Sequence, residues 1–558
     1  MKVLLTISLV LIYSLLKSQD LESVRNEDPI KVSGSFSLGT NYYCASGIED
    51  RFDPFIWTTS GNINLNVYGV LLPFSFLYSS QNTSVRQPFN RFGVTPYYKW
   101  VKLYLGYTTM NFSPFTFNGN SFLGAGVELR PENKIRFSAV YGRLRRAVES
   151  NFVSSFIIPT YRRSGFGFKI GYGDDASYVD LVMFRAYDDE NSIQVEDSLN
   201  INPQENLVLG IDSRYQITRR LSVAFEIATS AINRDRNAEP TTLTTRRIFN
   251  DLGGLFRANV SSEFYDAIQA KANYQLEKMD FEVNYKRIDP GYETLSTYFF
   301  NNDREEVAFN IGMNLFKDKV YARGGFGRQR NNLEGDESTT LVRLAGNASV
   351  NVNVNDRLNF GLNYSSFSST VEYLVDEFQA DSLNYVQVSD NYGAIVNYSV
   401  RSGDLNHSFS LNANYQTQNI DAQIENAGLN NSGLWNLNSS YNLNILPIKL
   451  RFNLGLNFNS NDISGINSER YGLNAGVSKN LLKNKLQLRL TAGGYNSIRD
   501  GNSENFTTNS GISGTFRFDK HHSIDSRIAL ITRNNNDSES MSPSFQEYRG
   551  QINYRYRF

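Results

Sequence analysis

Residues 545–558 read FQEYRGQINYRYRF, and this stretch decides the expected fold. One parity is largely aromatic and apolar, and it holds Tyr548, Gly550, Ile552, Tyr554, Tyr556 and Phe558. The other parity is polar and charged. Because successive side chains of a β-strand point to opposite faces, the stretch predicts a two-faced strand. A half-buried strand of a soluble sandwich has the same pattern, so the choice depends on the rest of the chain.

The composition combines overall polarity with many aromatic residues. The 558 residues are 40% hydrophobic and 20% charged, yet they include 33 Tyr and 38 Phe. A mean hydropathy of -0.40 is too polar for helical membrane spans. In a transmembrane barrel only every second strand residue faces lipid, and aromatic girdles lie at both interfaces. The composition therefore favours a transmembrane β-barrel.

The first nineteen residues, MKVLLTISLVLIYSLLKSQ, predict an export signal. Lys2 precedes an apolar core over residues 3–16, which is short for a membrane span and ends in polar Ser18 and Gln19. We expect a cleaved signal peptide over residues 1–19, with an uncleaved anchor as the alternative. Residues 20–30 then form a short periplasmic segment, and residues 31–558 form one barrel.

Strand-like alternation begins at Val32 and is cleanest from Leu341 onward. This early start leaves no room for a globular plug of about a hundred residues, which argues against a plugged, energy-coupled receptor. A first hairpin is expected to turn at residues 69–73. We find no fixed repeat length of the kind that a soluble propeller would show.

Short turns and longer polar stretches alternate in the C-terminal half. Short turns are expected near residues 355–357, 403–406, 446, 481–484 and 519–522, and long loops near 369–389, 418–432, 460–469, 497–507 and 534–543. Outer-membrane barrels have short periplasmic turns, longer extracellular loops and an even strand number. The expected fold is all-β, an antiparallel transmembrane barrel of about 22–26 strands.

Two resemblances support this fold. The ending resembles the C-terminal β-signal of bacterial outer-membrane proteins, with Tyr554, Tyr556 and Phe558 at its alternating aromatic positions, which implies recognition by the barrel-assembly machinery. Residues 90–149, GFGFKIGYGDDASYVDLVMFRAYDDENSI (165–193), PQENLVLG (203–210) and YKRIDPGYETLSTYFFNND (285–303) resemble segments of large, poorly characterised outer-membrane β-barrel proteins of the Bacteroidota. That resemblance implies location and fold, and it carries no activity.

Charge and cysteine content exclude several classes of function. Lys and Arg number 55 and Asp and Glu 56, and a net charge of -1 gives nucleic-acid binding no electrostatic support. A single cysteine, Cys44, allows no internal disulfide, and no Cys/His cluster suggests zinc. The acidic groups at 174–175, 188–190 and 301–303 lack the spacing of a calcium loop. We predict no cofactor and no metal.

An enzyme is not predicted either. Barrel hydrolases and acyltransferases resemble one another in placing a histidine near the outer rim. The three histidines here, His407, His521 and His522, are expected at periplasmic turns or strand starts. Without placed partners a histidine is not a catalytic site.

The remaining functional signal is the inward face of the C-terminal half. Parity places few acids there, such as Asp525, against these basic residues: Arg323, Arg343, Lys449, Arg451, Arg489, Arg517, Arg527, Arg555 and Arg557. Rings of Arg and Lys favour anions in a pore. Two alternatives stay open, namely a solvated lining and pairing with the carboxylates of a plug or partner.

Residues 230–261 interrupt the alternation. They fit a mobile external loop, and they also fit a loop folded into the lumen, with Arg246 and Arg247 as candidate constriction residues. Long loops usually lie at the surface, which favours the external loop.

We expect a porin-like or translocation channel for solute or polymer. The alternative is a non-conducting structural or assembly component of a secretion or glycan-handling complex. The expected partners are outer-membrane lipid, the barrel-assembly machinery, and periplasmic or outer-membrane proteins.

Overall fold

The computed structural model describes residues 29–81, 90–132, 134–149, 158–194, 201–250, 252–297, 301–373, 385–422, 431–536 and 543–558. The signal peptide expected over residues 1–19 lies outside the described residues.

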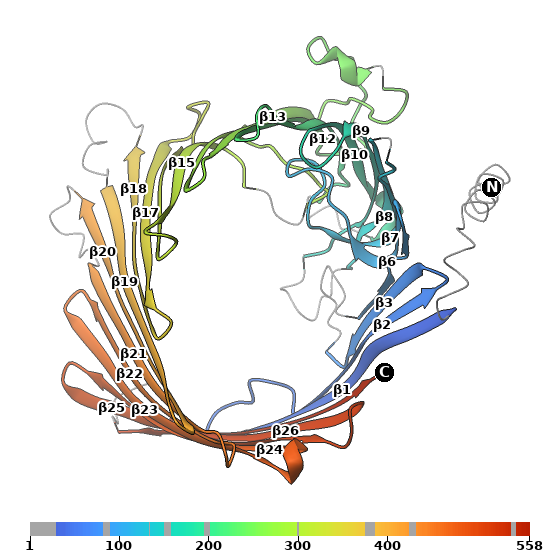
Figure 1. Ribbon diagram of the computed structural model, residues 1–558. Helices are drawn as coiled ribbons and strands as arrows, with labels where there is room; N and C mark the ends of the chain where they lie inside the picture. Colours follow the sequence, from blue (N-terminus) through green and yellow to red (C-terminus); the bar gives the residue numbers. More distant parts are fainter. Residues whose placement is uncertain are drawn as a thin grey trace.

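The described chain forms one closed antiparallel β-barrel (Figure 1). The structure has 27 strand segments, but β4 and β5 are two pieces of one strand between β3 and β6, so the barrel has 26 strands. The barrel closes where β1 pairs with β27, from Ser35 opposite Arg557 to Ser46 opposite Gln546. Figure 1 accordingly shows blue β1 beside the red C-terminal end. The expected fold class and strand number are confirmed.

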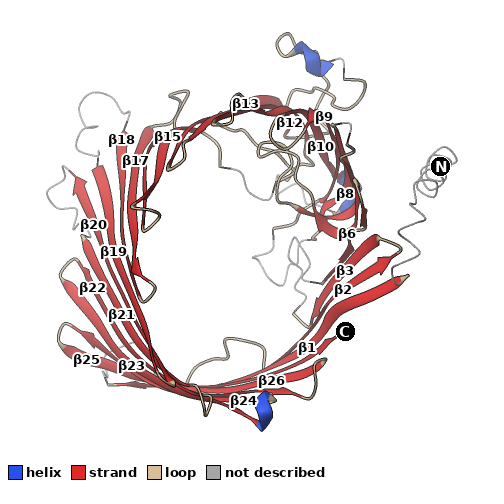
Figure 2. Cartoon of the chain, viewed as in Figure 1, coloured by secondary structure: helices blue, strands red, loops and turns tan. Residues whose placement is uncertain are grey.

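The strands lengthen toward the C-terminus, and only short 3-10 turns interrupt the loops (Figure 2). No described helix is both long and apolar enough to cross a membrane. The strands are β1 (Ile30–Ser46), β2 (Phe55–Val67), β3 (Val70–Ser79), β4 (Arg91–Val94), β5 (Tyr97–Tyr98), β6 (Val101–Thr109), β7 (Ser121–Leu129), β8 (Ile135–Arg145), β9 (Arg162–Gly173), β10 (Tyr178–Asp189), β11 (Glu205–Gln216), β12 (Leu221–Asn233), β13 (Ser262–Gln275), β14 (Met279–Ile288), β15 (Arg304–Leu315), β16 (Val320–Arg330), β17 (Thr339–Asn355), β18 (Leu358–Tyr373), β19 (Tyr385–Ser402), β20 (Leu405–Ala422), β21 (Ser432–Ile445), β22 (Leu450–Ile463), β23 (Ile466–Leu481), β24 (Leu486–Arg499), β25 (Asn502–Arg517), β26 (His522–Asn535) and β27 (Phe545–Arg557). The 3-10 turns are η1 (Glu190–Ser192), η3 (Arg247–Asn250) and η4 (Leu482–Asn484).

One end of the barrel, here the short-turn end, carries both ends of the barrel chain and the short hairpins that follow β2, β17, β19, β21, β23 and β25. In outer-membrane barrels this end faces the periplasm. The first hairpin turns at Tyr68 and Gly69, whose φ angles are 50° and 84°, and not over residues 69–73 as the sequence suggested. Pro73 lies within β3 opposite Asn64, and its carbonyl accepts a hydrogen bond from the Thr95 N–H at 3.1 Å.

Two of the expected long loops are wrong. Residues 460–469 and 497–507 belong to long strands that meet in two-residue turns, Ser464–Gly465 (φ 53° and 83°) and Asp500–Gly501 (φ 46° and 84°). Positive φ at both central residues is the geometry that fits the twist of a hairpin. The polarity of these stretches was mistaken for loop character. The other three expected loops contain strand ends, such as Tyr373 and Tyr385, and the rest of each lies largely outside the described residues.

The outward face carries an apolar band with aromatic rows. Ring centroids of outward side chains on β18 to β21 form a continuous stack, with Tyr364–Tyr392 at 5.0 Å, Tyr392–Tyr415 at 6.4 Å and Tyr415–Trp435 at 4.2 Å. A second row lies nearer the short-turn end, where Tyr398 pairs with Phe409 and Phe409 with Tyr441. Such girdles lie at the two interfaces of a membrane.

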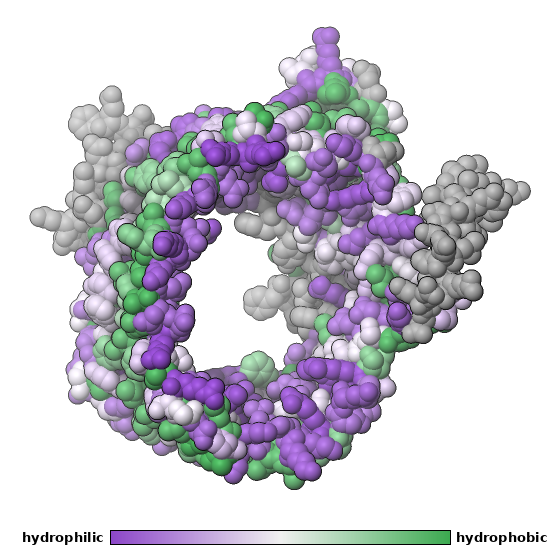
Figure 3. All heavy atoms as spheres, in the orientation of Figure 1, coloured by the Kyte–Doolittle hydropathy of each residue, from purple (hydrophilic) through white to green (hydrophobic). Residues whose placement is uncertain are grey.

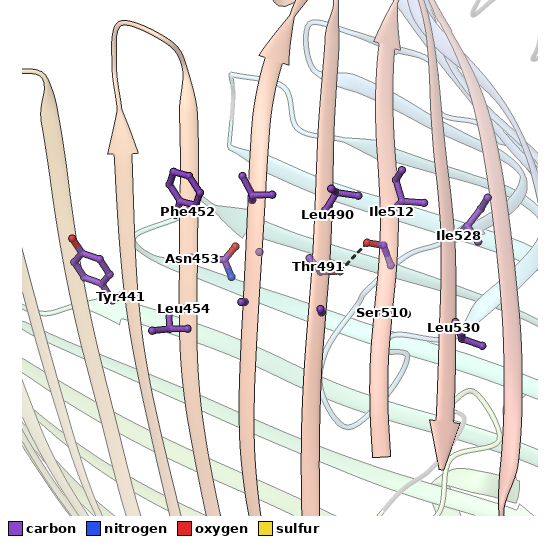
Figure 4. Close-up of a pocket in the computed structure, with 15 residues that line it drawn as sticks. Tyr441, Phe452, Asn453, Leu454, Leu490, Thr491, Ser510, Ile512, Ile528 and Leu530 are labelled. Atoms are coloured by element: carbon purple, nitrogen blue, oxygen red, sulfur yellow. Dashed lines mark hydrogen bonds between the residues drawn. The ribbon is translucent and has the colours of Figure 1, made fainter. Parts of the chain in front are cut away.

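An apolar groove crosses this band over β21 to β26 (Figure 4). Large outward side chains, including Phe452, Leu490 and Ile528, line it together with small Ala475 and Ala492. The groove lies on the face expected to contact lipid, so acyl chains would fill it. It is not part of the lumen.

Candidate functional site in the lumen

The interior of the barrel is open along its axis in the space-filling view and is lined mainly by hydrophilic residues (Figure 3). Cross-strand register fixes which parity faces inward. On β16, for example, Phe326 is 58% exposed on the outer face, so Arg323 has the inward parity. The lumen differs between its two halves: folded segments cover the wall in the N-terminal half, whereas no described segment covers the wall in the C-terminal half.

In the N-terminal half two loops fold inward and pack on the wall. We call residues 110–120, between β6 and β7, and residues 289–297, after β14, the inward shelf. Phe112, Phe115 and Phe117 from the first loop and Tyr292 from the second are at most 3% exposed. They pack on inward side chains of the wall in two apolar clusters, which include Phe122, Val140, Val182, Phe184, Val208 and Ala267. This half of the lumen therefore contains a core of its own.

Polar contacts hold the two shelf loops to each other and to the wall. The Tyr292 hydroxyl donates to the Phe115 carbonyl at 2.7 Å, and the Thr294 hydroxyl donates to the Thr116 carbonyl at 3.0 Å. From the wall, Glu226 accepts a hydrogen bond from the Phe115 N–H at 2.9 Å. Buried backbone groups need such partners, so the contacts fix the shelf in place.

Several inward charges in this half are paired. Arg136 binds Asp180 through two hydrogen bonds of 2.9 and 3.0 Å, and Lys169 lies 3.7 Å from the same carboxylate. Farther along the wall, Arg163 binds both oxygens of Asp188 at 2.7 and 2.9 Å. Pairing neutralises charges that would otherwise be costly to bury. These residues support the shelf and offer little free charge to a solute.

Eight inward arginines of the C-terminal half form no ion pair with another described residue, whereas Arg499 and Arg549, which also have the inward parity, pair with Glu504 and Glu547. Register gives the inward parity to Arg323, Arg343, Arg451, Arg489, Arg517, Arg527, Arg555 and Arg557. Six of these eight lie within four residues of the short-turn end of their strand; the exceptions are Arg343 and Arg527. Arg401, which the sequence reasoning missed, lies at the same end of β19, where its Nε donates to the Gly403 carbonyl at 3.2 Å. The short-turn mouth of this half is therefore basic.

Lys449, the ninth candidate, is not on a strand. It lies in the turn between β21 and β22 with a φ of 51°, and its Nζ donates to Asn484 Oδ1 at 2.9 Å. Strand parity does not extend through a turn, so its expected lumen position does not follow from the alternation. Asp525, the expected inward acid, accepts a hydrogen bond from the Thr515 hydroxyl at 2.6 Å.

The long loop between β12 and β13 lies against the outside of the wall. Phe249 and Phe256 pack there with Met183, Leu207 and Ala231, whose parity is that of the exposed Leu181, Ile211 and Phe225. Arg246 binds Asp266 of β13 at 2.6 and 3.1 Å, and Arg247 donates to the Thr244 carbonyl at 3.2 Å. Asp266 also has the outward parity, so the described part of this loop does not constrict the lumen at Arg246. The loop is external, but it is packed on the wall.

The histidines lie at the short-turn end and contact neighbouring strands or turns. His407 and His522 bond the hydroxyls of Tyr441 and Tyr554, each at 2.7 Å, and His521 Nδ1 lies 2.6 Å from the Arg557 carbonyl. None of the three has a nucleophile and carboxylate arranged around it among the described residues. The described residues also contain no group of three potential metal ligands.

A closed antiparallel barrel with an apolar outer band and a polar interior defines a transmembrane β-barrel of the outer-membrane type. Residues 343–528, one third of the chain, match the family model described as the outer membrane protein beta-barrel family. No curated protein matches the chain significantly.

Several solved barrels have similar structures. OpdK of Pseudomonas aeruginosa with vanillate is 12% identical, with 69% of this chain and 99% of that chain covered and a TM-score of 0.30. The translocation pore of the P pilus usher PapC is 12% identical, with 94% and 99% covered and a TM-score of 0.36. A mutant of the ferric enterobactin receptor PfeA from Pseudomonas aeruginosa is 8% identical, with 95% and 80% covered and a TM-score of 0.40.

Proposed function

We propose that this barrel is a channel for the passage of solute or polymer across the outer membrane. The observation that carries the proposal is the lumen itself, which the described residues leave open along the axis and line with hydrophilic side chains (Figure 3). A barrel of this size is too wide for its own wall side chains to fill. The inward shelf occupies the wall of only one half.

The channel prefers anions at its short-turn mouth. The eight inward arginines without ion-pair partners among the described residues support this preference. Of these, Arg517 on β25 and Arg555 and Arg557 on β27 lie on either side of β26. Basic rings favour anions in pores. The paired charges of the N-terminal half add little to this field.

The triple variant Arg517→Gln, Arg555→Gln and Arg557→Gln tests the preference. A unit charge about 8 Å from a permeating ion in water contributes ~0.5 kcal/mol, or about twofold in relative permeability. We therefore expect the anion-to-cation permeability ratio, measured from the reversal potential in a salt gradient, to fall several-fold. Arg328→Gln is the matched control because Arg328 lies on the outer face. A cation-selective wild-type channel would contradict the proposed preference.

The chain reaches the membrane by export and acts there without catalysis. We propose that residues 1–19 are cleaved and that the protein comes from a Bacteroidota cell; the apolar core of residues 3–16 and the resemblance of the quoted segments support these points. Mass determination of the mature N-terminus tests the cleavage. The assembly machinery would recognise Tyr554, Tyr556 and Phe558.

A further inference from the structure

Asparagines of the inward face lie over glycines of the neighbouring strand. A Cβ atom added to Gly393 would lie 2.3 Å from Asn363 Oδ1, and one added to Gly476 would lie 2.3 Å from Asn453 Oδ1. The same close approach occurs in the cross-strand pairs Gly361–Asn351 (2.7 Å), Gly455–Asn474 (2.5 Å) and Gly325–Asn347 (2.6 Å). Only glycine leaves room for an amide to lie flat against the wall. We call the inward faces of β17 to β23 the amide wall.

The amides of this wall are also linked to one another. The Ser410 hydroxyl donates to Asn397 Oδ1 at 2.8 Å, and Asn397 Nδ2 donates to Asn359 Oδ1 at 3.0 Å, which joins three adjacent strands. A second link runs from Asn414 Nδ2 to Asn391 Oδ1 at 2.7 Å. These bonds hold the amides in fixed orientations, so the wall is pre-organised for a ligand.

The middle strands of the amide wall, β18 to β21, carry almost no charge on their inward faces, whereas Arg343, Arg451 and Arg470 lie on the inward faces of β17, β22 and β23. Inward positions in the described parts of β18 to β21 hold Asn, Gln, Ser and Gly with a few apolar residues, and their charged exception is Arg401 at the short-turn end. Two aromatic residues have the inward parity there, Phe367, which is 40% exposed, and Tyr385 at the start of β19. A cation thus finds no counter-charge on the described inward positions of these four strands, and an anion finds only Arg401.

The chemistry of these amides selects a class of ligand. Each amide has two N–H donors and an oxygen with two lone pairs, and the links between strands use only part of this capacity. The remaining N–H and C=O groups of the amides face the lumen as adjacent, uncharged hydrogen-bond donors and acceptors. Sugar hydroxyls both donate and accept, so a saccharide can satisfy both. An apolar solute or a chain of ether oxygens would leave N–H or C=O groups without partners, which is unfavourable.

We infer that the amide wall binds neutral saccharide chains within the channel. This inference rests on the proposed channel function and names its solute class. Glycine opposite asparagine keeps the lumen wide enough for a chain, while the fixed amides supply many weak contacts. Weak contacts at multiple sites allow a polymer to enter and also to leave.

Maltoheptaose, as a neutral saccharide, tests the inference on the intact protein in planar bilayers. We expect it to interrupt the ionic current at concentrations at least tenfold lower than polyethylene glycol of matched hydrodynamic size, which fills the lumen equally but has no hydroxyls along its chain. Equal interruption by both polymers would overturn the saccharide inference and leave the channel function intact. If the folded barrel does not conduct, the proposed channel function is wrong. Calorimetric titration of the detergent-solubilised protein with maltoheptaose then still tests saccharide binding by the amide wall. If maltoheptaose does not bind, the saccharide inference is refuted.

The location of the site is tested with two matched triple variants. In Asn363→Ala, Asn397→Ala and Asn414→Ala, the loss of three hydrogen-bonding groups should shorten the saccharide dwell time about tenfold or more. The control variant lacks three inward asparagines outside the amide wall, through the combined substitutions Asn62→Ala, Asn64→Ala and Asn553→Ala. Heat-modifiable gel mobility establishes that both variants fold. Equal dwell times in both would show that the amide wall is not the binding surface.

Discussion

Truncation after Ser544, which removes β27 and Phe558, is expected to abolish the folded barrel. β27 pairs with β26 over His522–Arg533 and with β1 over Ser35–Ser46, so its loss leaves two unpaired strand edges. Within a bilayer each unsatisfied backbone group costs several kcal/mol, and open sheets are not viable there. Refolding from urea into detergent should give no heat-modifiable band. A compact, heat-modifiable truncated chain would contradict closure through β27.

A side-chain variant separates closure from targeting. Tyr554→Ala, Tyr556→Ala and Phe558→Ala together keep the backbone of β27 and its hydrogen bonds, so this variant should still refold in detergent. In cells it should fail to assemble, because the proposed β-signal is gone. Normal assembly of the variant in the outer membrane would refute the role proposed for these three residues.

Phe117→Ala is expected to loosen the inward shelf and to raise both the conductance and its noise. The Phe117 side chain is 0% exposed, and its ring stacks on Phe184 of the wall at 4.5 Å with an interplanar angle of 13°. It also contacts Phe112 and Phe122, with centroids 5.6 and 5.9 Å away. Truncating a buried phenylalanine typically costs ~3–5 kcal/mol, enough to release a loop held by local packing.

Single-channel recording and thermal unfolding both measure this effect. The control is Phe168→Ala, because Phe168 lies on the outer face of β9 and is 40% exposed. That variant should leave the open-channel current unchanged. If Phe117→Ala also leaves the conductance and the thermal stability unchanged, the shelf does not restrict the lumen.

Alternation of side chains made the barrel predictable from sequence, because every spanning strand must present one apolar and one polar face. The same parity gives the inward arginines of β22 to β27. Parity did not predict the position of Lys449, because this residue lies in a turn and the alternation of a strand does not continue through a turn. It also failed at Ser464 and Asp500, where polar strands continue through a tight turn and composition does not distinguish a strand from a loop. The Asp500–Gly501 dipeptide indicated the tight turn better than the polar composition did, because Asp-Gly favours two-residue hairpin turns.

The inward shelf was not predicted, because its residues follow no period. Residues 110–120 contain Phe112, Phe115 and Phe117 around Pro114, which is an apolar composition for an external loop and was a usable signal of burial. Where that loop packs depends on distant partners such as Tyr292. The position of Arg246 depends in the same way on Asp266, and single-sequence patterns do not report such contacts.

The most direct test of the channel is single-channel conductance of the purified wild-type protein in planar bilayers, with heat-modifiable mobility as proof of folding. An open, hydrophilic lumen predicts discrete and steady current steps without any partner. A folded barrel that stays silent at all voltages would contradict the channel and would favour a non-conducting assembly component.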